Sequence, residues 1–331
     1  MNIYVDGMGG DHAPDAVVKG CVDASKEFKK KITIIGDEEK IHELLQKESY
    51  QKDLIEVIPA SEIITNNEDP ALAIRRKKQS SLVIGLRRVK EEEDSVLVSA
   101  GSTGALLAGG TLLVGRIKGI QRPALTVMLP TKKGFSLLLD SGANVDCKPI
   151  YLQQFAIMAS IYAEDLLRIK NPKVALANIG TEEKKGNELT KESYQLLKET
   201  NITFVGNVEA RDILQGDVDI IVCDGFAGNM ILKATEGVGQ FLMDALKETI
   251  MSSTRAKIGG LLLKPALKEF KKKMDYTEVG GAPLLGIKGG IIKAHGSSNA
   301  KAITSAIKQA IKYQEEKITM KISNKVVEIK E

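Results

Sequence analysis

Hydroxyls and glycines occur together in the short segment Ser99–Gly104, a combination that suits the binding of a small anion. The segment follows an apolar run at Val96–Val98, typical of a buried strand, and precedes a small-residue apolar stretch at Ala105–Val114, typical of a helix. Backbone N–H groups converge where a helix begins, and the helix dipole favours an anion there. A tight turn with an N-cap hydroxyl and no ligand explains the same residues, and the turn alone slightly favours it.

Further polar residues lie at or just past the ends of other predicted strands: Asp6, Ser99, Asp140, Asn178 and Asp224. Open α/β sheets bind ligands at the carboxyl ends of their strands, so together these residues predict a polar rim. Helix capping explains each of them singly. Asp140 and Asp146 share one turn, but nothing in their spacing fixes a metal geometry, and we predict no metal site.

Two further loops carry charged side chains. The loop that begins at Asp6 is not the dinucleotide-binding fingerprint, because its third glycine would fall on His12. It offers Asp11 and His12 to a ligand, although a helix cap and a surface histidine explain them too. Lys184 and Lys185 follow a later predicted strand, Val174–Ala177, and two lysines there are stronger candidates than ordinary surface lysines.

The elements that position these residues are repeated strand–turn–helix units. Two strands, Ala124–Leu129 and Gly134–Asp140, are separated by a short turn that contains glycine and predict a β-hairpin. We therefore expect a three-layer α/β/α fold with a mixed, mostly parallel sheet. Residues 1–316 would form one large domain with a protruding helical segment at about 250–275, and residues 317–331 a charged tail with a marginal edge strand.

Composition excludes several classes of protein. The 331 residues are 43% hydrophobic and 27% charged, as in soluble globular proteins. Aromatic residues make up 4%, Trp is absent and the net charge is +4, so we expect no nucleic-acid partner. Three scattered cysteines favour a reducing cytoplasm, and a strand that begins near Met1 predicts no signal peptide. The uncharged stretch Ser95–Gly115 is long enough to span a membrane, but its glycines and hydroxyls favour a buried core segment.

The segment Arg255–Lys273 joins an apolar cluster to a basic run. This composition is typical of a membrane-surface or partner-docking helix. An amphipathic helix packed on a dimer partner explains it about as well. A second basic patch, Arg75–Lys78, is more often a solvated face than a site, although it could meet an acidic partner.

The ordered set of turns, from about residue 3 to residue 310, resembles the bacterial acyl-carrier-protein:phosphate acyltransferases, the PlsX family. The motifs that carry the resemblance are Val5–Pro14, Ser99–Leu106, Arg122–Leu125, Asp140–Asn144, Asn178–Gly180 with Lys184–Asn187, Asn207–Glu209, Cys223–Asn229, and Gly280–Ala282 with His295–Ser297. Two positions depart from the family pattern: Gly7 replaces Ala, and Ser102 replaces Asn and lacks its amide.

The resemblance implies a fold similar to the isocitrate/isopropylmalate dehydrogenase and phosphotransacetylase group. It implies reversible transfer of a long-chain fatty acyl group from acyl carrier protein to inorganic phosphate, without a cofactor. The acyl phosphate would serve phospholipid biosynthesis through a membrane glycerol-3-phosphate acyltransferase. The family is cytoplasmic, homodimeric and peripherally associated with the inner face of the cell membrane.

A thioester is already activated and phosphate is already an anionic nucleophile, so the site must mainly hold both and stabilise an oxyanion. Within the resemblance, Lys184 and Asn229 are the predicted catalytic pair. The predicted phosphate and acyl contacts are Asp11, His12, Ser99, Gly101, Ser102, Thr103, Gly104, Asp140, Asn144, Asn178, Asp224, Gly228 and His295. Ile258, Leu261, Leu262 and Leu263 would form a membrane or dimer tip, Arg255–Lys273 would meet anionic lipid, and Arg75–Lys78 the acidic carrier protein.

Two other functions remain open from the sequence. A nicotinamide- and metal-dependent dehydrogenase of the same fold group would need a dinucleotide site and clustered carboxylates. A non-catalytic membrane-surface adaptor would need only the segment Leu261–Lys273 and would leave the polar rim without a purpose.

Overall fold

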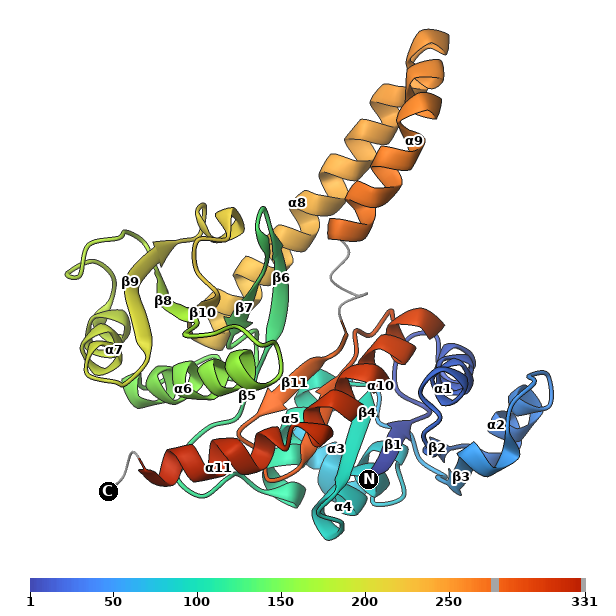
Figure 1. The fold of residues 1–331 in the computed structure, drawn as a ribbon. Coiled ribbons are helices and arrows are strands. Elements are labelled where there is room, and N and C mark those ends of the chain that lie inside the picture. The colour runs from blue at the N-terminus through green and yellow to red at the C-terminus, as the bar shows by residue number, and fades with distance from the viewer. Residues whose placement is uncertain (275–279, 329–331) are drawn as a thin grey trace.

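The computed structural model describes residues 1–274 and 280–328, whose strands form two sheets (Figure 1). The seven-stranded sheet has the order β3-β2-β1-β4-β12-β11-β5, and the five-stranded sheet has the order β6-β7-β10-β8-β9. Their bounds are β1 (Asn2–Asp6), β2 (Ile32–Gly36), β3 (Ile55–Pro59), β4 (Ser95–Ser99), β5 (Ala124–Leu125), β6 (Val127–Thr131), β7 (Gly134–Leu139), β8 (Lys173–Asn178), β9 (Thr203–Glu209), β10 (Ile220–Val222), β11 (Ala282–Leu285) and β12 (Gly290–Lys293). The predicted α/β class with mixed strands is confirmed, but the strands are divided between two sheets.

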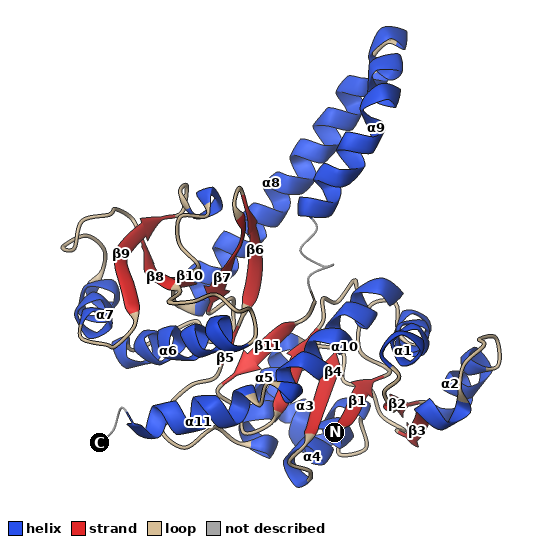
Figure 2. Cartoon of the chain, viewed as in Figure 1, coloured by secondary structure: helices blue, strands red, loops and turns tan. Residues whose placement is uncertain are grey.

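Helices cover the sheets in Figure 2. They are α1 (Asp15–Phe28), α2 (Glu38–Leu45), α3 (Pro70–Arg76), α4 (Ser81–Glu91), α5 (Thr103–Gly109, continued by a π-helical turn at Gly110–Val114), α6 (Pro149–Asp165), α7 (Glu188–Lys198), α8 (Gly225–Met251), α9 (Thr254–Met274), α10 (Ala300–Glu315) and α11 (Ile318–Glu328). Alternate strand residues face opposite sides of a sheet. Ile3 and Val5 therefore pack in one core with α1 and α10, whereas Tyr4 packs in another with α4 and α5.

The predicted hairpin is present as β6 and β7, which pair antiparallel from Val127–Leu138 to Thr131–Gly134. The first predicted strand of this pair, Ala124–Leu129, is interrupted at Thr126. The residues before it belong to the seven-stranded sheet as β5, and those after it to the five-stranded sheet as β6. The chain thus passes from one sheet to the other within a single residue.

The C-terminal segment is a helix and not the expected tail with an edge strand. In α11, Ile318, Ile322 and Val326 recur at a spacing of four residues and are buried, which is the pattern of an amphipathic helix. Lys321 forms an ion pair of 2.7 Å with Asp165 at the end of α6. Residues 329–331 of the predicted tail lie outside the described residues.

α8 and α9 form a helical hairpin that projects from the rest of the chain (Figure 1). The projection was expected at about 250–275, but it already includes the outer part of α8; Asp275 lies outside the described residues. Large apolar side chains are exposed along both helices, among them Phe241 at 68% and Leu262 at 79%. In the described part of the chain, no helix is long and apolar enough to cross a membrane.

Candidate active site

The turns after β1 and β4 are joined by a buried carboxylate. These strands are neighbours and parallel, so their carboxyl ends meet. Asp6 is 3% exposed and accepts hydrogen bonds from Ser81 Oγ at 2.6 Å and Ser99 Oγ at 2.7 Å. Burial raises the pKa of Asp6, and the two hydroxyls oppose that shift. Asp6 and Ser99 therefore pair with each other beneath the rim.

Most donors of the Ser99–Gly104 turn bind within the protein. Gly101 N–H donates to Ser99 Oγ at 3.1 Å, and Ser102 Oγ accepts from Ala105 N–H as the N-cap of α5. A Cβ atom on Gly104 would lie 2.8 Å from Pro70 Cγ, so this glycine permits close packing with α3. Among the described side chains of this turn, only that of Thr103 lines the cavity described below. Ser102 is therefore explained as a helix N-cap, and Thr103 remains a candidate for binding an anion.

The turns after β1, β4 and β12 are in direct contact. Between the first two, a Cβ atom on Gly9 would lie 2.5 Å from Asp6 Oδ2 and 2.7 Å from Gly101 N, so only glycine fits at this position. Asp11 N–H donates to Gly296 O at 2.8 Å. The side chains of Asp11 and His12 are exposed, and their predicted contact with phosphate stays a prediction.

Asp6→Ala is expected to lower the free energy of unfolding by about 1–3 kcal/mol, because it leaves two hydroxyl groups without their acceptor in a buried position. Asp11→Ala, in the same turn but exposed, serves as the matched control and should leave stability within about 0.5 kcal/mol. Urea denaturation measures both. Equal stability of the two variants would show that the carboxylate does not hold the turns.

A second buried carboxylate shapes the turn after β7. Asp140 accepts from Leu125 N–H at 3.0 Å, Asn144 N–H at 2.6 Å and Asn144 Nδ2 at 2.9 Å. Asp140 is fully buried, and burial raises its pKa. Both side chains thus bind within the protein, and their predicted contact with substrate remains untested.

α8 begins directly on this turn. Asp224 caps the helix by accepting from Ala227 N–H at 2.7 Å. A Cβ atom on Gly228 would lie 1.8 Å from Asp140 O, so the helix and the turn are in direct backbone contact. This contact places Asn229 beside Gly142, whose φ of +129° favours glycine.

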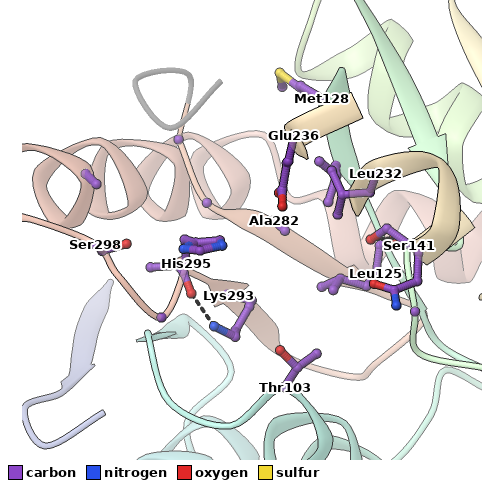
Figure 3. A pocket seen from close by; sticks show the side chains of 18 of the residues that line it. Thr103, Leu125, Met128, Ser141, Leu232, Glu236, Ala282, Lys293, His295 and Ser298 are labelled. Carbon is purple, nitrogen blue, oxygen red and sulfur yellow. Dashed lines mark hydrogen bonds between the residues drawn. The ribbon is translucent and has the colours of Figure 1, made fainter. Parts of the chain in front are cut away.

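A cavity of about 320 Å³ lies where α8 of the five-stranded sheet approaches the ends of β12 and β4 (Figure 3). Its polar lining residues include Thr103, Ser141, Asn229, Lys233, Glu236, Lys293, His295 and Ser298. Its apolar lining residues include Leu125, Val127, Met128 and Leu232. In Figure 3, Ser298 and His295 lie toward one end, and Leu125 and Leu232 toward the other. The cavity can therefore hold a ligand that carries both an anionic group and an apolar group.

Lys293 is a buried cation in this wall. It is 8% exposed, and its Nζ donates to Ala100 O at 3.3 Å and to Ala294 O. Burial lowers its pKa to about 8, against the opposing effects of Asp6 and Asp11. Burial also lowers the pKa of His295, so the neutral imidazole is favoured near neutral pH.

Sequence reasoning missed Lys233, Glu236, Lys293 and Ser298. Lys293 left a usable signal, because it is a lone charge that directly follows the apolar pair Ile291–Ile292 in a buried strand. Lys233 and Glu236 are one turn apart on α8 and pair at 2.7 Å, which the sequence alone does not distinguish from an ordinary surface pair.

The predicted catalytic pair is not brought into contact. Asn229 lines the cavity, and its side-chain amide makes no hydrogen bond to the residues that the structure describes. Lys184 is exposed on the loop after β8, and within residues 1–274 and 280–328 it does not line the cavity. Asn178 holds that loop by donating from Nδ2 to Lys185 O at 3.1 Å. The described residues contain no cluster of three or more His, Cys, Asp or Glu side chains suited to a metal.

The arrangement of strands is that of known acyl-transferring enzymes. A phosphotransacetylase from Streptococcus pyogenes superposes with a TM-score of 0.65 at 15% identity, covering 96% of this chain and 94% of that one. The EutD phosphotransacetylase from Staphylococcus aureus gives 0.62 at 16% identity, covering 95% and 94%. These similarities establish the phosphotransacetylase-related fold that the sequence predicted.

The chain belongs to the fatty acid synthesis protein family, whose family model matches residues 1–321. It is 57% identical to a phosphate acyltransferase of Alkaliphilus oremlandii over 98% of this chain and 97% of that protein. It is 56% identical to one of Clostridium acetobutylicum over 99% and 100%. The chain is therefore an enzyme, a phosphate acyltransferase, and the resemblance to PlsX is confirmed. The dehydrogenase and adaptor alternatives are set aside.

Proposed function

We propose that the enzyme reversibly transfers a long-chain fatty acyl group from acyl carrier protein to inorganic phosphate, forming acyl phosphate for phospholipid biosynthesis. The observation that carries this proposal is one cavity lined by both a buried cation and several apolar side chains. An ammonium can bind phosphate oxygens, and the apolar side chains can pack against the first part of an alkyl chain.

In this reaction a phosphate oxygen attacks the thioester carbonyl carbon. A carbon–oxygen bond forms, the carbon–sulfur bond breaks, and the proton of hydrogen phosphate ends on the carrier's thiol. The carbonyl oxygen gains negative charge on the way, and a fixed hydrogen-bond donor lowers that barrier. Asn229 is our candidate donor because its amide lines the cavity and is not used elsewhere among the described residues. Because a thioester is already activated and phosphate is already an anionic nucleophile, we propose no cofactor and no metal.

The decisive experiment follows thioester loss from long-chain acyl carrier protein with and without inorganic phosphate, and traps acyl phosphate with hydroxylamine. Phosphate-dependent hydroxamate formation is the expected result. Thioester loss that is independent of phosphate, or the absence of loss in a folded protein, would contradict the proposal. Replacing the acyl carrier protein with acyl coenzyme A tests whether the carrier itself is recognised.

Lys184→Ala is expected to lower kcat/KM by about 10²-fold, since we propose that its ammonium neutralises phosphate and the developing charge. The exposed loop that bears Lys184 follows β8, and β8 and β10 are parallel neighbours, so this loop and the start of α8 lie at one edge of the five-stranded sheet. Lys185→Ala is the neighbouring control. Steady-state kinetics of both variants decide the assignment, and near-normal turnover of Lys184→Ala would remove this lysine from the mechanism.

We also propose that residues 1–316 act as one catalytic domain, because a single apolar core includes side chains of both sheets. We propose a cytoplasmic homodimer that associates peripherally with the inner face of the membrane, where a glycerol-3-phosphate acyltransferase uses the product. The support is the projecting α8–α9 hairpin with Ile258, Leu261, Leu262 and Leu263 at 60%, 69%, 79% and 55% exposure. Light scattering tests the dimer, and sedimentation with anionic vesicles tests the membrane contact.

A further inference from the structure

We propose that Lys293 and Ser298 form the phosphate subsite of this enzyme, with the ammonium and the hydroxyl both contacting the phosphate oxygens. The proposal rests on the function proposed above and assigns its inorganic substrate to the part of the cavity beside these two residues. Both residues line that cavity, and both lie on the segment that leads from β12 into α10.

The backbone fixes the ammonium of Lys293 in place. Two of its three donors reach Ala100 O and Ala294 O, and these carbonyls belong to the segments that follow β4 and β12. One donor remains, and the described residues offer it no partner. The position of the charge is thus set before a ligand arrives, which is the condition for efficient electrostatic stabilisation.

No carboxylate in the described structure forms an ion pair with this buried cation. Asp6 directs its oxygens to Ser81 and Ser99, and Asp11 is exposed. A buried ammonium that no carboxylate contacts directly is costly, and an anionic ligand lowers that cost. Lys233, the other lysine of the cavity, differs because its side chain is 54% exposed and pairs with Glu236 at 2.7 Å.

Ser298 supplies a second, independent observation. It is 7% exposed, and its Oγ is buried without a hydrogen-bond partner among the described residues. Gln309 Oε1, also in the cavity wall, is buried and unpartnered too. Buried polar atoms are nearly always hydrogen-bonded, so two such atoms in one cavity wall indicate a polar occupant. A hydrogen phosphate offers acceptors to Ser298 and one donor to Gln309.

Three variants test the subsite by kinetics and by calorimetric titration with inorganic phosphate alone. Lys293→Met should raise the KM for phosphate and its Kd by about 10²-fold or more, while the KM for acyl carrier protein changes less than about threefold. Ser298→Ala should weaken phosphate binding about tenfold. Lys288→Met, at the exposed turn of the same β-hairpin, is the matched control and should behave as the unaltered enzyme.

The dependence on pH separates a charge that binds phosphate from a merely structural lysine. Asp6 and Asp11 from the β1 turn, Lys233 from α8 and His295 beside it are the charged and titratable groups that act on Lys293. Because its pKa is lowered to about 8, phosphate binding by the unaltered enzyme should weaken as pH rises past about 8. Arginine stays charged over this range, so Lys293→Arg should bind phosphate at pH 7 and should not show the weaker phosphate binding above the pKa of the lysine.

Unchanged phosphate affinity in Lys293→Met, or an identical fall at high pH in Lys293→Arg, would overturn the subsite. Melting temperatures of all variants identify misfolding, and if Lys293→Met does not fold, Lys293→Arg and Ser298→Ala still decide the question. The two proposals fail differently. Calorimetric phosphate binding that Lys293→Met abolishes, without phosphate-dependent thioester loss, would support the subsite and refute the acyl transfer.

Discussion

Asn229→Ala is expected to lower kcat by about 10²- to 10³-fold, the usual effect of losing one donor to a developing oxyanion. The amide lies in the first turns of α8, beside the backbone of Gly142, and lines the cavity without another hydrogen bond in the described structure. Single-turnover kinetics at saturating phosphate measure the chemical step directly. Met230→Ala, at the next position and 59% exposed, is the control.

A double variant then tests whether Asn229 and Lys184 act on the same transition state. Their side chains do not touch in the described structure, so effects through stability alone should add. If both contact the reacting group, the combined loss should be well below the product of the two single losses. Turnover of Asn229→Ala close to that of Met230→Ala would refute its role as a donor.

Gly228→Ala is expected to destabilise the fold by about 3 kcal/mol or to prevent folding, because the new methyl group would meet a backbone oxygen that cannot move away. A Cβ atom there would lie 1.8 Å from Asp140 O and 2.9 Å from Cys223 Sγ, both in the buried core. The substitution should also displace the start of α8 from the cavity. Urea denaturation gives the change in the free energy of unfolding.

A second glycine of α8 offers a control variant in which the free energy of unfolding should change in the opposite direction. A Cβ atom on Gly237 would have no described neighbour within 4 Å, so alanine there meets open space. Gly237→Ala should stabilise α8 by up to about 1 kcal/mol through helix propensity alone. Similar changes in both variants would mean that the contact of Gly228 with the Asp140 turn does not constrain the helix.

Local patterns in the sequence predicted many elements well. The hairpin of β6 and β7, for example, followed from its short glycine turn. The division into two sheets did not follow, because strand pairing joins residues far apart in sequence. Nothing local marks Thr126 as the point where the chain leaves one sheet for the other.

The candidate site, too, could be predicted from the sequence only in part. Polar residues at strand ends were predicted as a group, but a polar residue at a strand end can point to the rim or to a buried partner. Asp6 and Asp140 point to buried partners and hold the turns, whereas Thr103 and Asn229 line the cavity. Lys293 was missed although it directly follows the apolar pair Ile291–Ile292; the fold adds that its strand is paired with β4 on one side and with β11 on the other.

α8 is a single rod that begins at the cavity and ends in the projecting hairpin. Its 27 residues span about 40 Å at 1.5 Å per residue. The close backbone contact of Gly228 with Asp140 O lies near the inner end and fixes that end of the helix. A tilt applied at the outer end therefore barely displaces Asn229, one residue from that contact, but moves Glu236, about 12 Å along the rod, considerably further. A movement of the outer hairpin would thus change the cavity more at Glu236 than at Asn229.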